Sequence, residues 1–122
     1  MELGKLEIHK LALKLSDNIW QIYINLDNDL KYNIGNQVIR SIDSIGANIA
    51  EGYGRFHYKD SIKFYYNARG SLWESKHWTY LLYKRNLVDK KEYEEIIKDL
   101  EILGKKLNGF INTIKDKNAN IK

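Results

Sequence analysis

The stretch that decides the fold is Asp89–Ile114, which reads DKKEYEEIIKDLEILGKKLNGFINTI. It opens with Asp89-x-x-Glu92, a capping box in which the aspartate accepts a hydrogen bond from the backbone of the first helical turn. Apolar residues then recur at intervals of three and four, the spacing of one helical face; they are Tyr93, Ile96, Ile97, Leu100, Leu103, Leu107, Phe110, Ile111 and Ile114. The stretch therefore predicts an amphipathic helix over residues 89–115, with residues 116–122 fraying where the period is lost.

The same spacing recurs upstream and predicts three more helices, over about residues 6–26, 33–53 and 58–85. Asp27-Asn-Asp separates the first two, and Gly52 and Gly54 are expected to reverse the chain after the second with positive φ. Four helices joined by short loops favour an all-α fold, an antiparallel up-down four-helix bundle. The 122 residues are expected to form this one domain.

The composition supports long helices and excludes several classes of chemistry. The chain has no proline, and it has no cysteine, which excludes disulfides, thiolate zinc sites and a cysteine nucleophile. No run approaches the roughly 18 uncharged apolar residues of a membrane span. The first residues, MELGKLE, carry acids where a signal peptide has a basic region. We therefore expect a cytoplasmic protein with no membrane partner.

The excess of cations lies in the middle of the chain. Overall 20 Lys and Arg stand against 16 Asp and Glu, for a net charge of +4, and residues 41–85 contribute +3 of it, with seven cations and four acids. The candidate phosphate contacts are expected to cluster around the turn between the second and third helices; they are Arg40, Arg55, Lys59, Lys63 and Arg69.

The predicted helix over residues 58–85 has two unlike faces. One carries small and medium side chains suited to the bundle interior, namely Ser61, Tyr65, Ala68, Leu72, Ser75, Thr79 and Leu82. The opposite face carries aromatic residues between lysines, and its candidate interface residues are Tyr66, Trp73, His77 and Tyr80. Three interpretations fit this face: an interface between copies of the chain, stacking on nucleic-acid bases, or completion of the chain's own core.

Two segments carry a more specific pattern than helical periodicity requires. Residues 37–55 contain Ala-Asn-Ile-Ala-Glu-Gly-x-x-Arg, and Ala68-Arg-Gly-Ser-Leu-x-Glu74 follows. Together they resemble the bacterial four-helix-bundle family encoded in intervening sequences of 23S ribosomal RNA genes, which includes the accessory variability determinant proteins of diversity-generating retroelements. The resemblance covers about residues 6–115. It implies an all-helical bundle, a homo-oligomer that is typically a pentameric ring, and no known catalytic activity.

For the retroelement members, the resemblance also implies binding of RNA and of a reverse transcriptase through a basic surface; a ribosomal component is another partner that the family suggests. The residues that match the family pattern are expected to be structural; they are Asn48, Glu51, Gly52, Arg55, Gly70, Ser71 and Glu74. Of these, Asn48, Glu51 and Arg55 are expected to form a buried hydrogen-bonded clasp. The chain departs from the family at Ile39, where a second basic residue is common, and at Gly46, where proline is usual.

Four-helix bundles also house carboxylate metal sites, which need two Glu-x-x-His motifs and two further glutamates. This chain has one such motif, Glu74-x-x-His77, and no second. We therefore expect no metal, no cofactor and no enzyme activity. The expected function is a non-enzymatic oligomeric bundle that binds RNA or a nucleic-acid-processing partner. The alternatives are a protein-interaction scaffold without nucleic-acid contact and, more remotely, a metal-dependent enzyme.

Overall fold

The computed structural model describes residues 6–55 and 57–121, with side chains through Lys117, and this part of the chain is entirely helical between its turns. Helix α1 spans Glu7–Ile24. A short helix α2 (Asn28–Leu30) passes through a π-helical turn η2 (Lys31–Gly35) into α3 (Asn36–Tyr53). Helix α4 spans Tyr58–Lys84 and α5 spans Lys90–Ile121.

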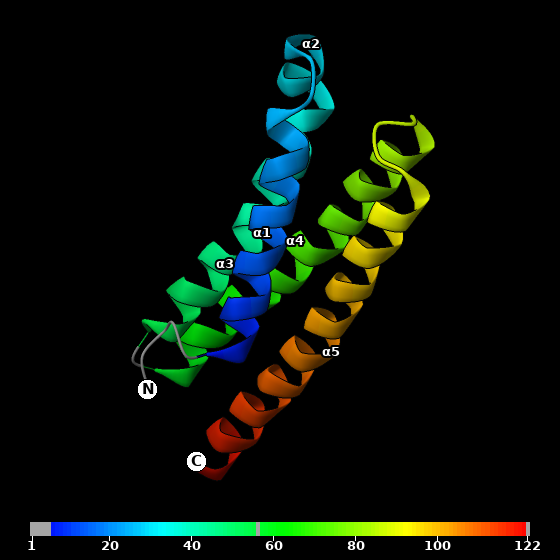
Figure 1. The fold of residues 1–122 in the computed structure, drawn as a ribbon. Coiled ribbons are helices and arrows are strands. Elements are labelled where there is room, and N and C mark those ends of the chain that lie inside the picture. Colours follow the sequence, from blue (N-terminus) through cyan, green and yellow to red (C-terminus); the bar gives the residue numbers. More distant parts are fainter. Residues whose placement is uncertain (1–5, 56, 122) are drawn as a thin grey trace.

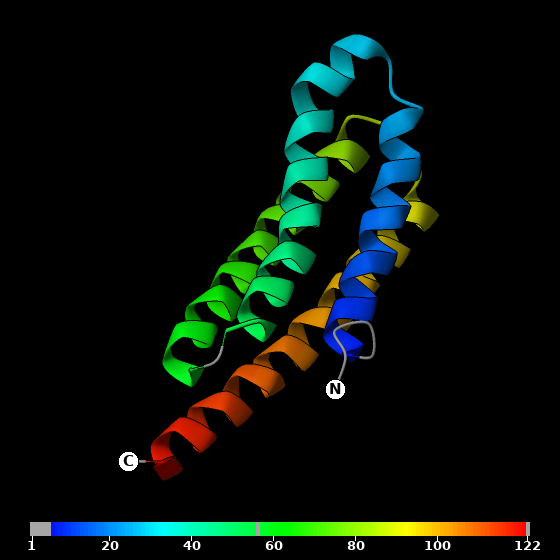
Figure 2. The ribbon, with the colours of Figure 1, turned by 90° about the vertical axis from the view of Figure 1, so that its left-hand side faces the viewer.

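The four long helices run alternately up and down (Figures 1 and 2). Helix α4 packs between α3 and α5, and α1 closes the bundle by packing on α3 and α5. Short connections lie at both ends, so neighbours in sequence are neighbours in space. The predicted all-α four-helix bundle is confirmed. Helix α3 ends and α4 begins at the lower end of the bundle in Figure 1, where α5 also finishes.

The core consists of the apolar stripes that the helical period predicts. In the second predicted helix the apolar residues that recur at intervals of three and four are all buried, namely Ile34, Val38, Ile42, Ile45 and Ile49. The interior stripe of α4 is buried throughout, including its hydroxyl residues Ser61, Ser75 and Thr79. Such small groups let α3 and α4 approach closely: Ser75 Oγ lies 3.1 Å from Ser41 Oγ across their contact.

The second helix begins earlier than the predicted residue 33. Asp27 has an extended backbone, and helical structure starts at Asn28. The helix is kinked rather than broken, because Asn33 leaves helical geometry (φ −118°, ψ −107°) inside the π-helical turn. A π-turn accommodates one extra residue without ending a helix. The Asp27-Asn-Asp segment therefore separates α1 from α2, and the helix that follows is several residues longer than periodicity indicates.

The last helix also ends later than its predicted end at residue 115. Helix α5 continues to Ile121, so the expected fraying from residue 116 is wrong up to that point, and Lys122 lies outside the described residues. Nucleation is the costly step of helix formation. Once a long helix has formed, each further residue adds one backbone hydrogen bond without a new nucleation cost. The apolar period stops where α5 extends past the neighbouring helices (Figure 2), so the period marks the end of packing and not the end of the helix.

The helix termini confirm one expectation and correct another. Asp89 Oδ1 accepts a 2.7 Å hydrogen bond from the Glu92 backbone N–H, as the capping box predicts. The expected positive φ at Gly52 and Gly54 is wrong, because no described glycine has positive φ. Gly52 is instead required by close approach: a Cβ there would lie 2.9 Å from Cζ of Tyr65. Glycine is therefore required at position 52 because it has no side chain, and not because of its conformational freedom.

Tyr65 gives the fold a pH dependence at alkaline pH. Burial, with a smaller effect of Tyr53, raises the pKa of Tyr65 to about 12 from an ordinary value of 10.0. The unfolded chain therefore loses this proton first, and stability that is fully present below pH 10 is lost as pH rises to about 12. We expect Tyr65→Phe to remove this loss, worth at most about 3 kcal/mol. Urea denaturation of both proteins at pH 9 and pH 11.5 measures it; equal losses in both proteins would contradict the assignment.

Candidate nucleic-acid interface

Three of the five predicted phosphate contacts meet where α3 passes into α4. Arg55, Lys59 and Lys63 are all exposed there. The Arg55 guanidinium lies 4.8 Å from the centre of the Phe64 ring, and Lys63 Nζ lies 5.3 Å from the same ring. A cation held over an aromatic face keeps its charge at the surface while its aliphatic stem is packed. The positive charges of Arg55 and Lys63 are therefore held at the surface by packing against Phe64.

The C-terminal part of α5 adds two cations to this end of the bundle. Lys117 Nζ lies 6.0 Å from the ring of Tyr58, at the start of α4, and Lys115 Nζ lies 5.5 Å from the ring of Tyr66. The sequence analysis missed both because it expected this segment to fray; the absence of Gly or Pro after Gly109 was the available signal. The basic end is defined here as the set of exposed cations Arg55, Lys59, Lys63, Lys115 and Lys117.

The other two predicted contacts do not join this group. Arg69 borders it, because its guanidinium lies 4.8 Å from the Tyr66 ring that Lys115 also approaches. Arg40 lies 15 residues from Arg55 on the same helical run, about 22 Å along the axis. The predicted clustering of all five around one turn is therefore wrong for Arg40, because positions that far apart in one helix cannot meet.

Arg40 instead borders a polar hollow of about 270 Å³ between α3 and α4. Two residues of the family pattern, Ser71 and Glu74, line the same hollow, with Gln37, Ser41 and Ser44. One of the lining hydroxyls, Ser41 Oγ, donates to the Val38 carbonyl oxygen at 3.0 Å. The two segments that carry the family pattern thus come together in space at the α3–α4 contact, which supports a structural role for Ser71.

The expected clasp of Asn48, Glu51 and Arg55 forms only in part. Arg55 Nη2 and Glu51 Oε1 are 2.6 Å apart, but their side chains are 46% and 52% exposed. Asn48 Nδ2 donates to the Ser44 carbonyl oxygen at 2.9 Å, within its own helix. The expectation of a buried clasp is wrong because Glu51, in the last turn of α3, and Arg55, just after its end, are both exposed. An exposed pair one turn apart stabilises a helix by only about 0.3–0.5 kcal/mol.

The aromatic face of α4 is open in the single chain. The exposed fractions of Trp73 and Tyr80 are 63% and 44%, so the interpretation that they complete the chain's own core is wrong for these two. His77 is exposed as well, while Tyr66 is half-buried beneath Arg69 and Lys115. A Cβ at Gly70 would meet nothing within 4 Å, so this glycine lies beside open space.

Helix α1 carries a second exposed apolar group that the sequence analysis did not select. Leu13, Trp20 and Ile24 are 42–49% exposed and lie on one side of the helix. The ring of Trp20 stacks on Tyr23 with 5.4 Å between centroids. These three residues are not part of the buried stripe of α1, which consists of Ile8, Ala12, Leu15, Ile19 and Ile22. Their apolar side chains at positions outside that stripe were the sequence signal that could have identified them.

The described residues contain no group of three or more His, Cys, Asp or Glu side chains placed to hold a metal ion. Glu74 faces the polar hollow, and His77 lies edge-on to the Trp78 ring with 4.8 Å between centroids. Among the described residues, no helix combines the length and apolar character needed to cross a membrane.

Comparisons with known proteins agree with this architecture. The family model of the 23S rRNA-intervening sequence protein matches residues 4–109. A crystal structure from Bacteroides thetaiotaomicron, of a protein of unknown function from the S23 ribosomal protein family, superposes with a TM-score of 0.79. The two sequences are 28% identical, over 85% of this chain and 97% of that one. No curated protein matches the sequence. The family match spans most of the helical bundle, and the chain belongs to the 23S rRNA-intervening sequence protein family.

Proposed function

We propose that this protein is a non-enzymatic homo-oligomer that binds RNA through the basic end of the bundle. The observation that carries the proposal is the convergence of five exposed cations from three segments, the end of α3, the start of α4 and the end of α5. Four of them, all but Lys59, lie against the rings of Tyr58, Phe64 and Tyr66. Lysine and arginine between aromatic rings suit a flexible strand, whose phosphates need cations and whose bases need flat apolar surfaces.

The net positive charge of the basic end in one chain is modest. Glu51 pairs with Arg55, Asp60 follows Lys59 in sequence, and Asp116 lies between Lys115 and Lys117. Assembly of several copies would repeat the basic end and raise the local potential. The pentameric ring that the family resemblance implies would supply such repetition. This is why oligomerisation and RNA binding are proposed together.

The test is the salt dependence of RNA binding by the wild-type protein. Neutralising phosphates releases counterions, so affinity for a single strand falls with salt at a slope of about −0.7 per phosphate contact. Fluorescence anisotropy with a labelled unstructured RNA should therefore show an affinity that drops steeply between about 50 and 200 mM salt. Binding that does not respond to salt, or no binding at 50 mM, would contradict the proposal and favour a protein-interaction scaffold.

We place self-association on the His77 and Tyr80 half of the aromatic face. Large exposed rings are the usual anchors of protein interfaces. The wild-type protein is expected to have a solution mass that is a multiple of 14.4 kDa. Tyr80→Glu should shift the mass toward a single chain, because a carboxylate would be buried at the contact.

Light scattering at several protein concentrations measures this mass. Tyr32→Glu is the matched control, since Tyr32 is 81% exposed and lies in the η2 turn, outside α4. A wild-type mass of one chain at every concentration would contradict self-association. Equal effects of Tyr80→Glu and Tyr32→Glu would place the contact elsewhere.

A further inference from the structure

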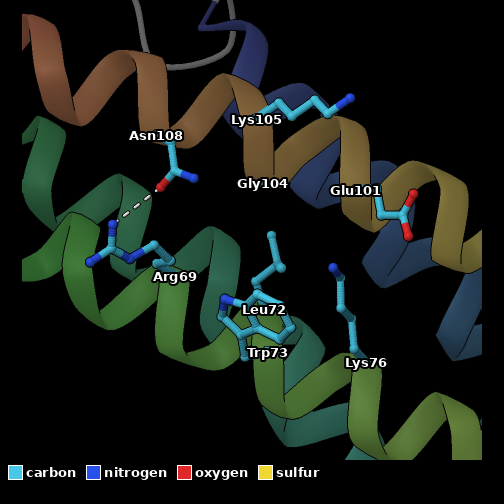
Figure 3. A pocket seen from close by; sticks show the side chains of 8 residues that line it. All are labelled: Arg69, Leu72, Trp73, Lys76, Glu101, Gly104, Lys105 and Asn108. Atoms are coloured by element: carbon cyan, nitrogen blue, oxygen red, sulfur yellow. Dashed lines mark hydrogen bonds between the residues drawn. The ribbon is translucent and has the colours of Figure 1, made fainter.

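A hollow of about 230 Å³ opens between α4 and α5, beside the aromatic face (Figure 3). Its floor is apolar: Leu72 is buried, and Gly104 faces it from α5. A Cβ at Gly104 would lie 3.7 Å from both Leu72 methyl carbons, so a larger side chain there would occupy the hollow. The glycine therefore keeps a flat, shallow space between the two helices.

The wall of the hollow is the indole of Trp73, which is 63% exposed. Lys76 Nζ lies 4.3 Å from the centre of its ring, so a cation already rests on the indole. An exposed tryptophan over an apolar floor offers a stacking surface for a flat aromatic group. Ligand pockets for drug-sized molecules measure about 300–1,000 Å³, so the smaller space here suits a single planar ring system.

The rim of the hollow is basic and partly fixed in place. Arg69 Nη1 donates a 3.2 Å hydrogen bond to Asn108 Oδ1 across the helix contact (Figure 3). The same guanidinium lies 4.8 Å from the Tyr66 ring, so two contacts hold it at the edge. Lys76 and Lys105 add two cations, against the single acid Glu101. The group that fits this rim therefore carries negative charge.

We propose that this hollow binds one unpaired nucleotide of an RNA strand, with the base against Trp73 and Leu72 and its phosphate near Arg69 and Lys76. The proposal rests on the proposed function and extends it. Continuity with the basic end supports it, because the Tyr66 ring lies between Arg69 of the rim and Lys115 of the basic end. A strand lying across the basic end would thus reach the hollow without leaving a basic surface.

An apolar side chain from a second copy fits the hollow less well. It would fill the space above Leu72 but would leave the rim cations unpaired, and burying unpaired charge is costly. A nucleotide provides both the flat ring and the anion. Stacking also implies a preference that charge alone does not produce, since bases are available in single strands and hidden in a duplex.

The experiment compares Trp73→Leu with the wild-type protein on a labelled single-stranded RNA and on a duplex of the same length. We expect single-strand affinity to fall about tenfold and duplex affinity to stay within twofold. Trp73→Phe should retain most of the single-strand affinity because it keeps an aromatic ring. Trp20→Leu is the matched control: it removes an exposed tryptophan that does not line the hollow, and should leave both affinities unchanged.

Other outcomes overturn the proposal in distinguishable ways. If the wild-type protein binds with the expected salt response and Trp73→Leu binds single strands equally well, the hollow is not a nucleotide site and the proposed function stands. If Trp73→Leu lowers the solution mass of the free protein, the hollow belongs to an interface between copies. If the wild-type protein binds no RNA at low salt, the proposed function fails and the nucleotide site fails with it. Circular dichroism melting of each variant confirms that the bundle is intact.

Discussion

Replacing Gly52 with alanine is expected to lower the free energy of unfolding by about 2 kcal/mol. The added Cβ would lie 2.9–3.1 Å from three carbons of the Tyr65 ring. That ring has little room to move, because Tyr65 is 2% exposed and packs edge-on against Phe110 with 4.9 Å between centroids. Overpacking of this kind forces a backbone shift that outweighs the roughly 1 kcal/mol gained by replacing a helical glycine with alanine.

Gly109→Ala is the matched control for this prediction. Gly109 also lies inside a helix, but a Cβ there would meet nothing within 4 Å, so this variant should gain up to about 1 kcal/mol. Urea denaturation gives both values. In addition, Gly52→Ala should cost less when Tyr65 is already leucine, because the clashing ring is gone. Equal stability of Gly52→Ala and Gly109→Ala would show that Tyr65 does not set the requirement for glycine.

Replacing Arg55, Lys59 and Lys63 together with glutamine is expected to weaken RNA binding about 10- to 100-fold at ~0.1 M salt. All three side chains are exposed, and the first and third lie over Phe64. Removing them takes away the cations contributed by the α3–α4 turn and leaves those of α5. The lower part of the range allows for Arg55, part of whose charge is already matched by Glu51.

The control for this triple variant removes the same charge elsewhere. Lys10, Lys91 and Lys98 are exposed and lie outside the basic end, so their replacement with glutamine changes net charge equally. This second variant should lose only a small part of the affinity, through the overall field of the protein. If the two triple variants bind equally weakly, net charge determines binding and the basic end has no special role.

The sequence predicts the buried part of this molecule well because burial follows the helical period. The interior stripe of α4 is the clearest example, since every residue assigned to it, from Ser61 to Leu82, is buried. The period works even though four of its members carry hydroxyl groups, because size and spacing decide what fits between helices. The capping box at Asp89 is predicted equally well, since its hydrogen bond involves residues three apart in sequence.

The candidate site depends on contacts between segments, which periodicity does not report. Lys115 and Lys117 reach the rings of Tyr66 and Tyr58 only because α5 continues past the bundle, and loss of the apolar period suggested that it would not. Arg40 was included in the predicted cluster because it is close to Arg55 in sequence. Fifteen residues of helix place the two about 22 Å apart along the axis. The hollow beside Trp73 is lined by α4 and also by Gly104 and Asn108 of α5. The sequence pattern of α4 alone therefore identifies the tryptophan but cannot predict the space beside it.

The central claim is that the basic end contacts RNA phosphates, and the most direct test is the difference in salt slope between the wild-type protein and the Arg55, Lys59 and Lys63 triple glutamine variant. Each lost phosphate contact on a single strand should reduce the slope of log affinity against log salt by about 0.7. We therefore expect the variant's slope to be shallower by about 2 if all three side chains contact phosphate. Parallel lines for the two proteins, whatever their absolute affinities, would contradict the claim.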